Sequence, residues 1–266
     1  MLARASLLSL VLIAAAPAFA VAPDTVLLEE LTWTELRDAI GAGTTTILVP
    51  VGGTEQNGPH MAVGKHNVRV RVLAERIALA LGHTLVAPVI AYVPEGRISP
   101  PTGHMRFPGT ISVPEDTFER VLDAAARSFR QHGFRDVVFV GDHGSTQAGQ
   151  RAVAARLNRE WAGGPTRVHA IEEYYRASQV EFAHALRAKG YGEAEIGTHA
   201  GLADTALMLA LDARLVRADR LRPGTGEAGD GVEGDPTRAT AELGRAGADL
   251  VVTKTVEAVT RALARR

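Results

Sequence analysis

The sequence feature that most constrains the fold is a pair of short, strongly apolar runs that each end in glycine. Residues 46–51 are followed by Gly52, and residues 136–140 are followed by Gly141. Runs of five or six residues in which apolar and polar side chains do not alternate are typical of strands buried on both faces of a parallel sheet. Parallel strands need long crossover connections, so these runs predict an α/β fold rather than an all-β one.

Stretches with helical spacing separate the apolar runs. In residues 68–81 apolar side chains recur at helical spacing, and Gly82, a residue type that commonly ends helices, follows at once. We expect further helices at residues 114–132, 147–161, 177–189, 205–211 and 239–265, further strands at 85–90 and 168–171, and a long loop at 222–235. Strands interleaved with such helices predict a single three-layer domain, with a mostly parallel sheet and helices on both faces.

The N-terminus has the three parts of a secretory signal peptide. Arg4 supplies the charged start, residues 7–16 the apolar stretch, and Ala18 to Ala20 the small-x-small cleavage site. The alternative, an uncleaved anchor, needs an apolar stretch of roughly 20 residues to span a bilayer. We therefore expect residues 1–20 to be removed, a domain at residues 24–266 without a membrane span, and a periplasmic or secreted protein.

Composition excludes several classes of function. The chain has 29 Lys and Arg against 30 Asp and Glu, which leaves no positive footprint for nucleic acid. It contains no cysteine, so disulfides, a thiol nucleophile and thiolate metal sites are excluded. A metal site in this chain must therefore be built from His, Asp and Glu.

Polar residues follow both apolar runs, where ligands bind in open α/β sheets. Glu55 and His66 come after the first run, His143 comes after the second, and His199 and Asp204 open a predicted helix. These are donors that suit Zn²⁺ or Mn²⁺. Each also has a structural interpretation: His199 and Asp204 as polar groups at a helix start, and His143 as a buried, hydrogen-bonded side chain. The residues alone therefore predict a metal hydrolase and nothing finer.

Five segments in the same order resemble motifs of the creatininase (creatinine amidohydrolase) family. They are Pro50–Met61, His104–Ser112, Gly141–Thr146, His199–Ala206 and Gly231–Thr240. The resemblance implies a single α/β domain with one or two Zn or Mn ions per chain beyond the strand ends. It also implies hydrolysis of cyclic amides or related C–N bonds in a small-molecule substrate, and a homo-oligomer, which in many members is a hexamer.

The resemblance also implies roles for individual residues. Glu55 and His143 match metal ligands of the family, Asp204 stands at a metal-binding or site carboxylate, and His199 matches a proton shuttle. Two positions depart from the pattern. Asn57 replaces a histidine that binds the second metal, and His66 replaces an aspartate that bridges the two metals.

A neutral imidazole has one lone pair, so His66 cannot bridge two ions as a carboxylate does. We therefore expect one or two ions per chain; the donors that remain, Glu55, His66, His143 and Asp204, are enough for one ion and are the predicted ligand set. We place Asn57, His60 and His104 around it, as groups that orient the ligands or contact substrate.

The predicted function is metal-dependent hydrolysis of a cyclic amide or another C–N bond. Water activated by the metal would attack the carbonyl carbon, His199 would protonate the departing nitrogen, and Asp204 would complete the metal shell or orient the water. The alternative is a non-catalytic protein of the same fold that binds a small solute or a partner. Serine hydrolysis through Ser145 is disfavoured, because the Gly-x-Ser-x-Gly motif is missing.

Overall fold

The computed structural model describes residues 24–265, so the predicted signal peptide (residues 1–20) lies outside the described residues. The strands are β1 (Thr46–Val51), β2 (Thr84–Val86), β3 (Asp136–Gly141) and β4 (Arg167–Ala170). The helices are α1 (Trp33–Gly41), α2 (Lys65–Leu81), α3 (Glu115–Gln131), α4 (Gln147–Glu160), α5 (Glu173–Arg176), α6 (Phe182–Ala188), α7 (Glu193–Ile196), α8 (Leu202–Asp212) and α9 (Ala241–Leu263). A π-helical turn at Ala177–Glu181 joins α5 to α6, and short 3-10 helices lie at Leu28–Glu30, Gly103–Arg106, Gly144–Thr146, Ala213–Leu215, Ala218–Arg220 and Pro236–Arg238.

The sheet confirms the predicted parallel topology. Its four strands lie in the order β2-β1-β3-β4, and each neighbouring pair is parallel. Thr46 of β1 is in register with Thr84 of β2 and Asp136 of β3, so the two long strands begin and end together. The carboxyl ends of β1 and β3, at Val51 and Gly141, therefore lie side by side, and the segments that follow them meet.

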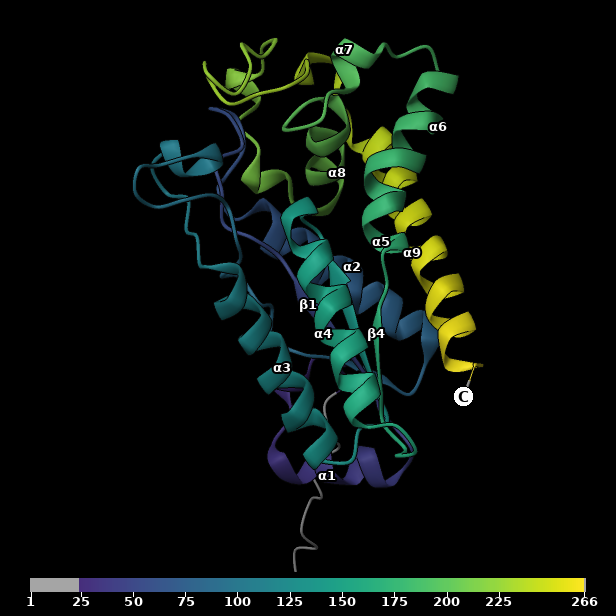
Figure 1. Cartoon of the computed structure of the whole chain (residues 1–266). Helices are drawn as coiled ribbons and strands as arrows, with labels where there is room; N and C mark the ends of the chain where they lie inside the picture. The colour runs from purple at the N-terminus through teal and green to yellow at the C-terminus, as the bar shows by residue number, and fades with distance from the viewer. Residues whose placement is uncertain (1–23, 266) are drawn as a thin grey trace, which may run out of the picture.

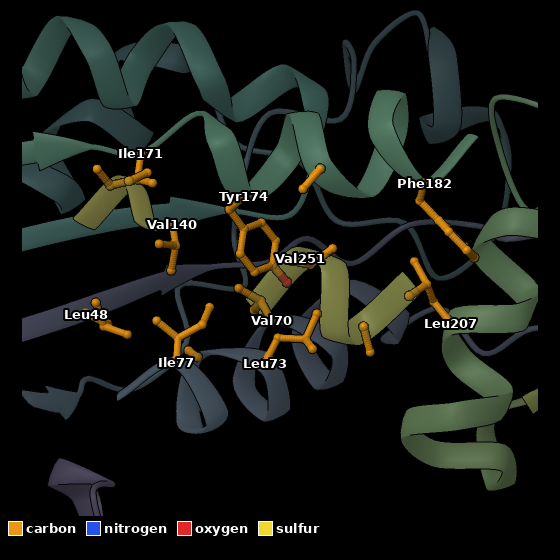
Figure 2. Packing of buried hydrophobic residues seen from close by; sticks show 14 of the residues in the cluster. Leu48, Val70, Leu73, Ile77, Val140, Ile171, Tyr174, Phe182, Leu207 and Val251 are labelled. Atoms are coloured by element: carbon orange, nitrogen blue, oxygen red, sulfur yellow. The ribbon is translucent and has the colours of Figure 1, made fainter. Parts of the chain in front are cut away.

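The two faces of the sheet carry separate hydrophobic cores, as expected for a sheet with helices on both faces. Alternate residues of β1 point to opposite sides: Ile47 and Val49 pack in the cluster formed with α3 and α4, whereas Leu48 packs in the cluster formed with α2 and α9. Figure 2 shows the second cluster, in which the ring of Tyr174 lies among side chains of the sheet, α2 and α9.

Several predicted boundaries shift in the structure. The strand expected at residues 85–90 ends at Val86, and the chain continues beside β1 through a single parallel bridge between Val51 and Ile90. Helix α1 was not predicted; Thr32 and Glu35 form a capping box at its start. Helix α2 begins at Lys65, three residues before the predicted start, which brings Lys65 and His66 onto the first turn of a helix.

Helix α8 is held by a close contact with α9. A Cβ at Gly244 of α9 would lie 1.8 Å from the carbonyl oxygen of Ala206 on α8, so only glycine permits this approach. The contact fixes the first turn of α8, which carries Asp204.

In Figure 1, α7 and α8 lie at one end of the molecule and α1 lies at the other. Among the helices of residues 24–265, none is both long and apolar enough to cross a membrane.

Candidate metal centre

The segments that follow β1 and β3 enclose a pocket of about 320 Å³. Asp142, directly after β3, donates its backbone N–H to the carbonyl of Val51 at 2.9 Å, which ties the two strand ends together. The side chains that line the pocket are mostly polar and include Gln56, Lys65, His66, His104, Asp142, His143, Tyr175, Gln179, Thr198, His199, Asp204, Glu227 and Glu233.

Glu55 is buried directly behind the histidines that line this pocket. Its Oε1 lies 2.7 Å from Nε2 of His66, and its Oε2 lies 3.0 Å from Nε2 of His143 and 3.1 Å from Nε2 of His104. Burial alone would raise the pKa of Glu55, but the charge of His66 and the hydrogen bonds from both His143 and His66 outweigh it and hold that pKa well below its usual range. Glu55 is therefore an ionised carboxylate with three imidazoles around it.

Glu95 brings a second buried carboxylate to the same place. Its Oε2 lies 3.3 Å from Nε2 of His143, yet among the residues described neither of its oxygens accepts a hydrogen bond. Burial, and then the charge of Glu55, raises the pKa of Glu95 to about 10. A buried carboxylate that faces another carboxylate is costly unless one of them is protonated, as this raised pKa implies for the metal-free chain, or a cation lies between them.

Four side chains offer donor atoms that could hold such a cation. One atom from each of Glu55, Glu95, His104 and His143 lies within 4.8 Å of the others. Two carboxylate oxygens and two imidazole nitrogens are a donor set that suits Zn²⁺ or Mn²⁺. The unsatisfied oxygens of Glu95 show that the site fits a divalent ion.

The imidazole of His143 is oriented for this role by Ser145. The Oγ of Ser145 lies 2.7 Å from Nδ1 of His143 and donates its own proton to the carbonyl of Pro94 at 2.6 Å. The backbone N–H of Ser145 also donates to Nδ1, at 3.2 Å, so without a metal Nδ1 accepts and Nε2 donates to Glu55. With a metal bound, Oγ of Ser145 would accept the proton on Nδ1, which would leave the Nε2 lone pair for the ion. Burial lowers the pKa of His143, so the ring is neutral near pH 7, as a metal ligand must be.

His66, in contrast, lies between two carboxylates. Its Nε2 contacts Glu55, and its Nδ1 lies 2.5 Å from Oδ2 of Asp142. Asp142 is fully buried and also accepts hydrogen bonds from Nε of Arg69, at 2.8 Å, and from the hydroxyl of Tyr174, at 2.8 Å. Both ring nitrogens of His66 therefore already have partners inside the chain.

Asp204 is bonded to internal cations. Its Oδ2 lies 2.7 Å from Nζ of Lys65 and accepts the N–H of Ala200 at 3.0 Å, while its Oδ1 lies 2.6 Å from NH1 of Arg69. Burial would raise the pKa of Asp204, but the charges of Lys65 and Arg69 hold it well below its usual range. The structure thus brings Glu55 and His143 together with His104, and it does not bring His66 or Asp204 into the same group of donors.

The remaining predicted residues surround the centre. His199 places Nδ1 3.6 Å from Oε1 of Glu55 and Nε2 2.9 Å from the carbonyl of Gln56. Burial, and then the charge of Lys65, lowers the pKa of His199 to about 3. Asn57 donates to the carbonyl of Glu55 at 2.9 Å, and Nε2 of His60 lies 3.1 Å from Oγ1 of Thr205, so both stabilise the loop that holds Glu55.

Glu95 and Lys65 are the important residues that the sequence analysis missed. Glu95 follows no strand directly; it is held where Val93 pairs with Ser112, and its own backbone N–H donates to Oγ of Ser112 at 2.9 Å. Lys65 is completely buried, a state that is rare for lysine. The only sequence signal for it was the spacing of Lys65, His66 and Arg69, which places three basic residues within the first two turns of α2.

Comparisons with known proteins agree with this architecture. The family model described as "Creatininase: Creatinine amidohydrolase" matches residues 29–259. A curated creatinine amidohydrolase of Pseudomonas putida is 28% identical over 200 residues, which cover 74% of this chain and 76% of the relative. A mycofactocin precursor peptide peptidase of Mycobacterium tuberculosis is 29% identical over 233 residues, with 75% of this chain and 78% of the relative covered.

Two solved structures match over almost the whole fold. One is described as a creatininase with Mn and the other as a creatininase variant of Zn-Zn type. Each is 25% identical, covers 90% of this chain and 99% of its own, and superimposes with a TM-score of 0.72. These matches confirm the single α/β domain and the resemblance found in the five sequence motifs.

Proposed function

The chain belongs to the creatininase family, whose relatives named above are hydrolases, and from this premise we propose that it is a metal-dependent hydrolase of a cyclic amide or another non-peptide C–N bond. One observation carries the proposal. The buried carboxylate of Glu95 has no hydrogen-bond donor, faces Glu55, and lies with two imidazoles around a point that suits a divalent ion.

Glu55, Glu95, His104 and His143 are the ligands that we propose. The family neighbours carry Mn or Zn, and both ions accept a mixed set of carboxylate and imidazole donors. We leave His66 and Asp204 out of the set, because their donor atoms already bond to Asp142, Glu55, Lys65 and Arg69.

When bound, the ion supplies a Lewis acid for the carbonyl and a water that is nucleophilic near neutral pH. Next to it, His199 serves as the proton carrier. The carbonyl of Gln56 can only accept a hydrogen bond, so Nε2 of His199 donates to it and Nδ1 remains an acceptor close to Glu55. Nδ1 of the neutral His199 would therefore be the acceptor that relays a proton to the leaving nitrogen, and its pKa of about 3 means that the ring would hold that proton only transiently.

The pocket restricts the substrate. A volume of about 320 Å³ lined mostly by polar residues suits a small polar molecule better than a folded or extended polymer. Gln56 and Thr198 line the wall close to His199 and can hydrogen-bond to an amide.

Activity measurements after metal reconstitution test this function. We expect the Zn- or Mn-loaded protein to hydrolyse at least one member of a panel of small amides that includes creatinine, and we expect His143→Ala to abolish both activity and metal binding. His184→Ala changes an exposed histidine on α6 and is the matched control. A protein that binds metal but hydrolyses no amide would support the alternative, a binding protein of the same fold.

A further inference from the structure

We propose that this centre takes a single divalent ion per chain. The buried cations Lys65 and Arg69 on α2 already supply the positive charge that a second ion would bring. The inference rests on the proposed metal-dependent function and makes it more specific. Lys65 is fully buried, lines the pocket, and has its Nζ 2.7 Å from Asp204 and 3.9 Å from Oε1 of Glu55.

The first argument is the supply of donor atoms. Outside the group of four proposed ligands, the buried carboxylates that line the pocket are Asp142 and Asp204. Asp142 is occupied by Arg69, Tyr174 and His66, and Asp204 is occupied by Lys65 and Arg69. In the part of the chain described, no other group of three His, Asp or Glu residues is placed to hold an ion.

The second argument is charge. Four buried carboxylates meet here, and they are Glu55, Glu95, Asp142 and Asp204. Lys65 and Arg69 neutralise two of those charges, and one divalent ion neutralises the other two. A second divalent ion would leave an excess of two positive charges in a buried site, which is strongly unfavourable.

His66 adds to the first argument. Its two ring nitrogens both face carboxylate oxygens, at 2.7 Å from Oε1 of Glu55 and 2.5 Å from Oδ2 of Asp142, so neither is free to bind a second ion. The Zn-Zn description of a solved relative therefore does not carry over to this chain.

Metal stoichiometry and affinity test the inference. The full mature chain is stripped with chelator, titrated with Mn²⁺, and measured by elemental analysis and by electron paramagnetic resonance. We expect saturation at one Mn²⁺ per chain without the signature of a coupled pair. Two ions per chain would overturn the single-ion inference and leave the metal-dependent function standing, whereas no bound ion would overturn the function itself.

A substitution separates the role of Lys65 from general structural effects. Lys65→Met removes the charge and keeps most of the volume, so we expect Mn²⁺ to bind at least tenfold more tightly to a variant that melts as a folded protein. Lys254→Met is the control, since the side chain of Lys254 is partly exposed and pairs with Glu257 on the same helix, α9. An unchanged affinity in a folded Lys65→Met variant would overturn the role of Lys65, and if the variant does not fold, the stoichiometry of the wild type still decides.

Discussion

Glu95→Gln separates the stability of the metal-free protein from its ability to bind metal. The substitution keeps the shape of a completely buried side chain and removes the charge that faces Glu55. In the metal-free protein, burial and the charge of Glu55 raise the pKa of Glu95 from 4.5 to about 10. The folded chain therefore holds Glu95 protonated at neutral pH, while the unfolded chain ionises it.

The sign of the effect follows from this difference. Because the folded pKa lies above the unfolded value, the stability of the wild type is complete below pH 4.5 and falls as the pH rises toward 10. Each pH unit inside that window lowers the free energy of unfolding by about 1.4 kcal/mol. The amide introduced by Glu95→Gln does not titrate, so between pH 5 and pH 8 the variant should gain up to about 4 kcal/mol over the wild type.

Urea unfolding of the metal-free proteins at pH 5 and pH 8 measures this gain. We expect Glu95→Gln to be close to the wild type at pH 5 and clearly more stable at pH 8, and saturating Zn²⁺ to reverse the order, because the wild type keeps a ligand that the variant lacks. Glu75→Gln, which changes a partly exposed glutamate on α2, is the control and should show neither change. A variant less stable than the wild type at pH 8, or a difference independent of pH, would refute the reasoning.

Three further predictions address the surroundings of the site and the N-terminus. Ser145→Ala should weaken metal binding about 10- to 100-fold, because it removes the partner of Nδ1 of His143; a loss of activity with unchanged metal affinity would instead favour serine chemistry. Tyr174→Phe should lower the free energy of unfolding by about 1.5–3 kcal/mol in urea, because it removes a buried hydrogen bond to the charged Asp142, and an unchanged midpoint would contradict this. In a bacterial host, mass spectrometry of the periplasmic fraction should find a mature chain that begins at Val21; an intact N-terminus would argue against cleavage.

The fold was predictable because its signals are apolar. The continuous runs that became β1 and β3 predict buried parallel strands, and the two cores on either side of the sheet follow from that. Helix α1 was missed because only a capping box marks it, and the start of α2 was missed because its first turn begins with charged and polar residues. The first turn of α2 is buried by charged side chains that pair with carboxylates, and a search for periodic apolar side chains cannot detect such a turn.

The residues of the candidate site also fall into two groups, those that could be predicted from the sequence and those that could not. Glu55, His143 and His199 follow strand ends or open a loop before a helix, and their convergence could be predicted from topology. Glu95 could not, because its position depends on contacts between Val93, Glu95 and Ser112 that only tertiary packing makes. The internal partners of Asp204 were equally hidden, since Lys65 and Arg69 come from a helix more than 130 residues earlier in the sequence.

The buried charged residues beneath the pocket, Lys65, Arg69, Asp142 and Asp204, support a functional role for the site. Lys65 and Arg69 are both completely buried, and burying such ions costs free energy that their partners Asp204 and Asp142 only partly restore. Well-packed apolar side chains of similar volume commonly give equal or greater stability, so stability does not explain why four ions lie beneath this pocket. A fixed array of cations that neutralises Asp142 and Asp204 does explain it, because these carboxylates are then unavailable to metal. Any ion that enters is thereby directed to Glu55 and Glu95, because Nζ of Lys65 lies 3.9 Å from Oε1 of Glu55 but only 2.7 Å from Oδ2 of Asp204.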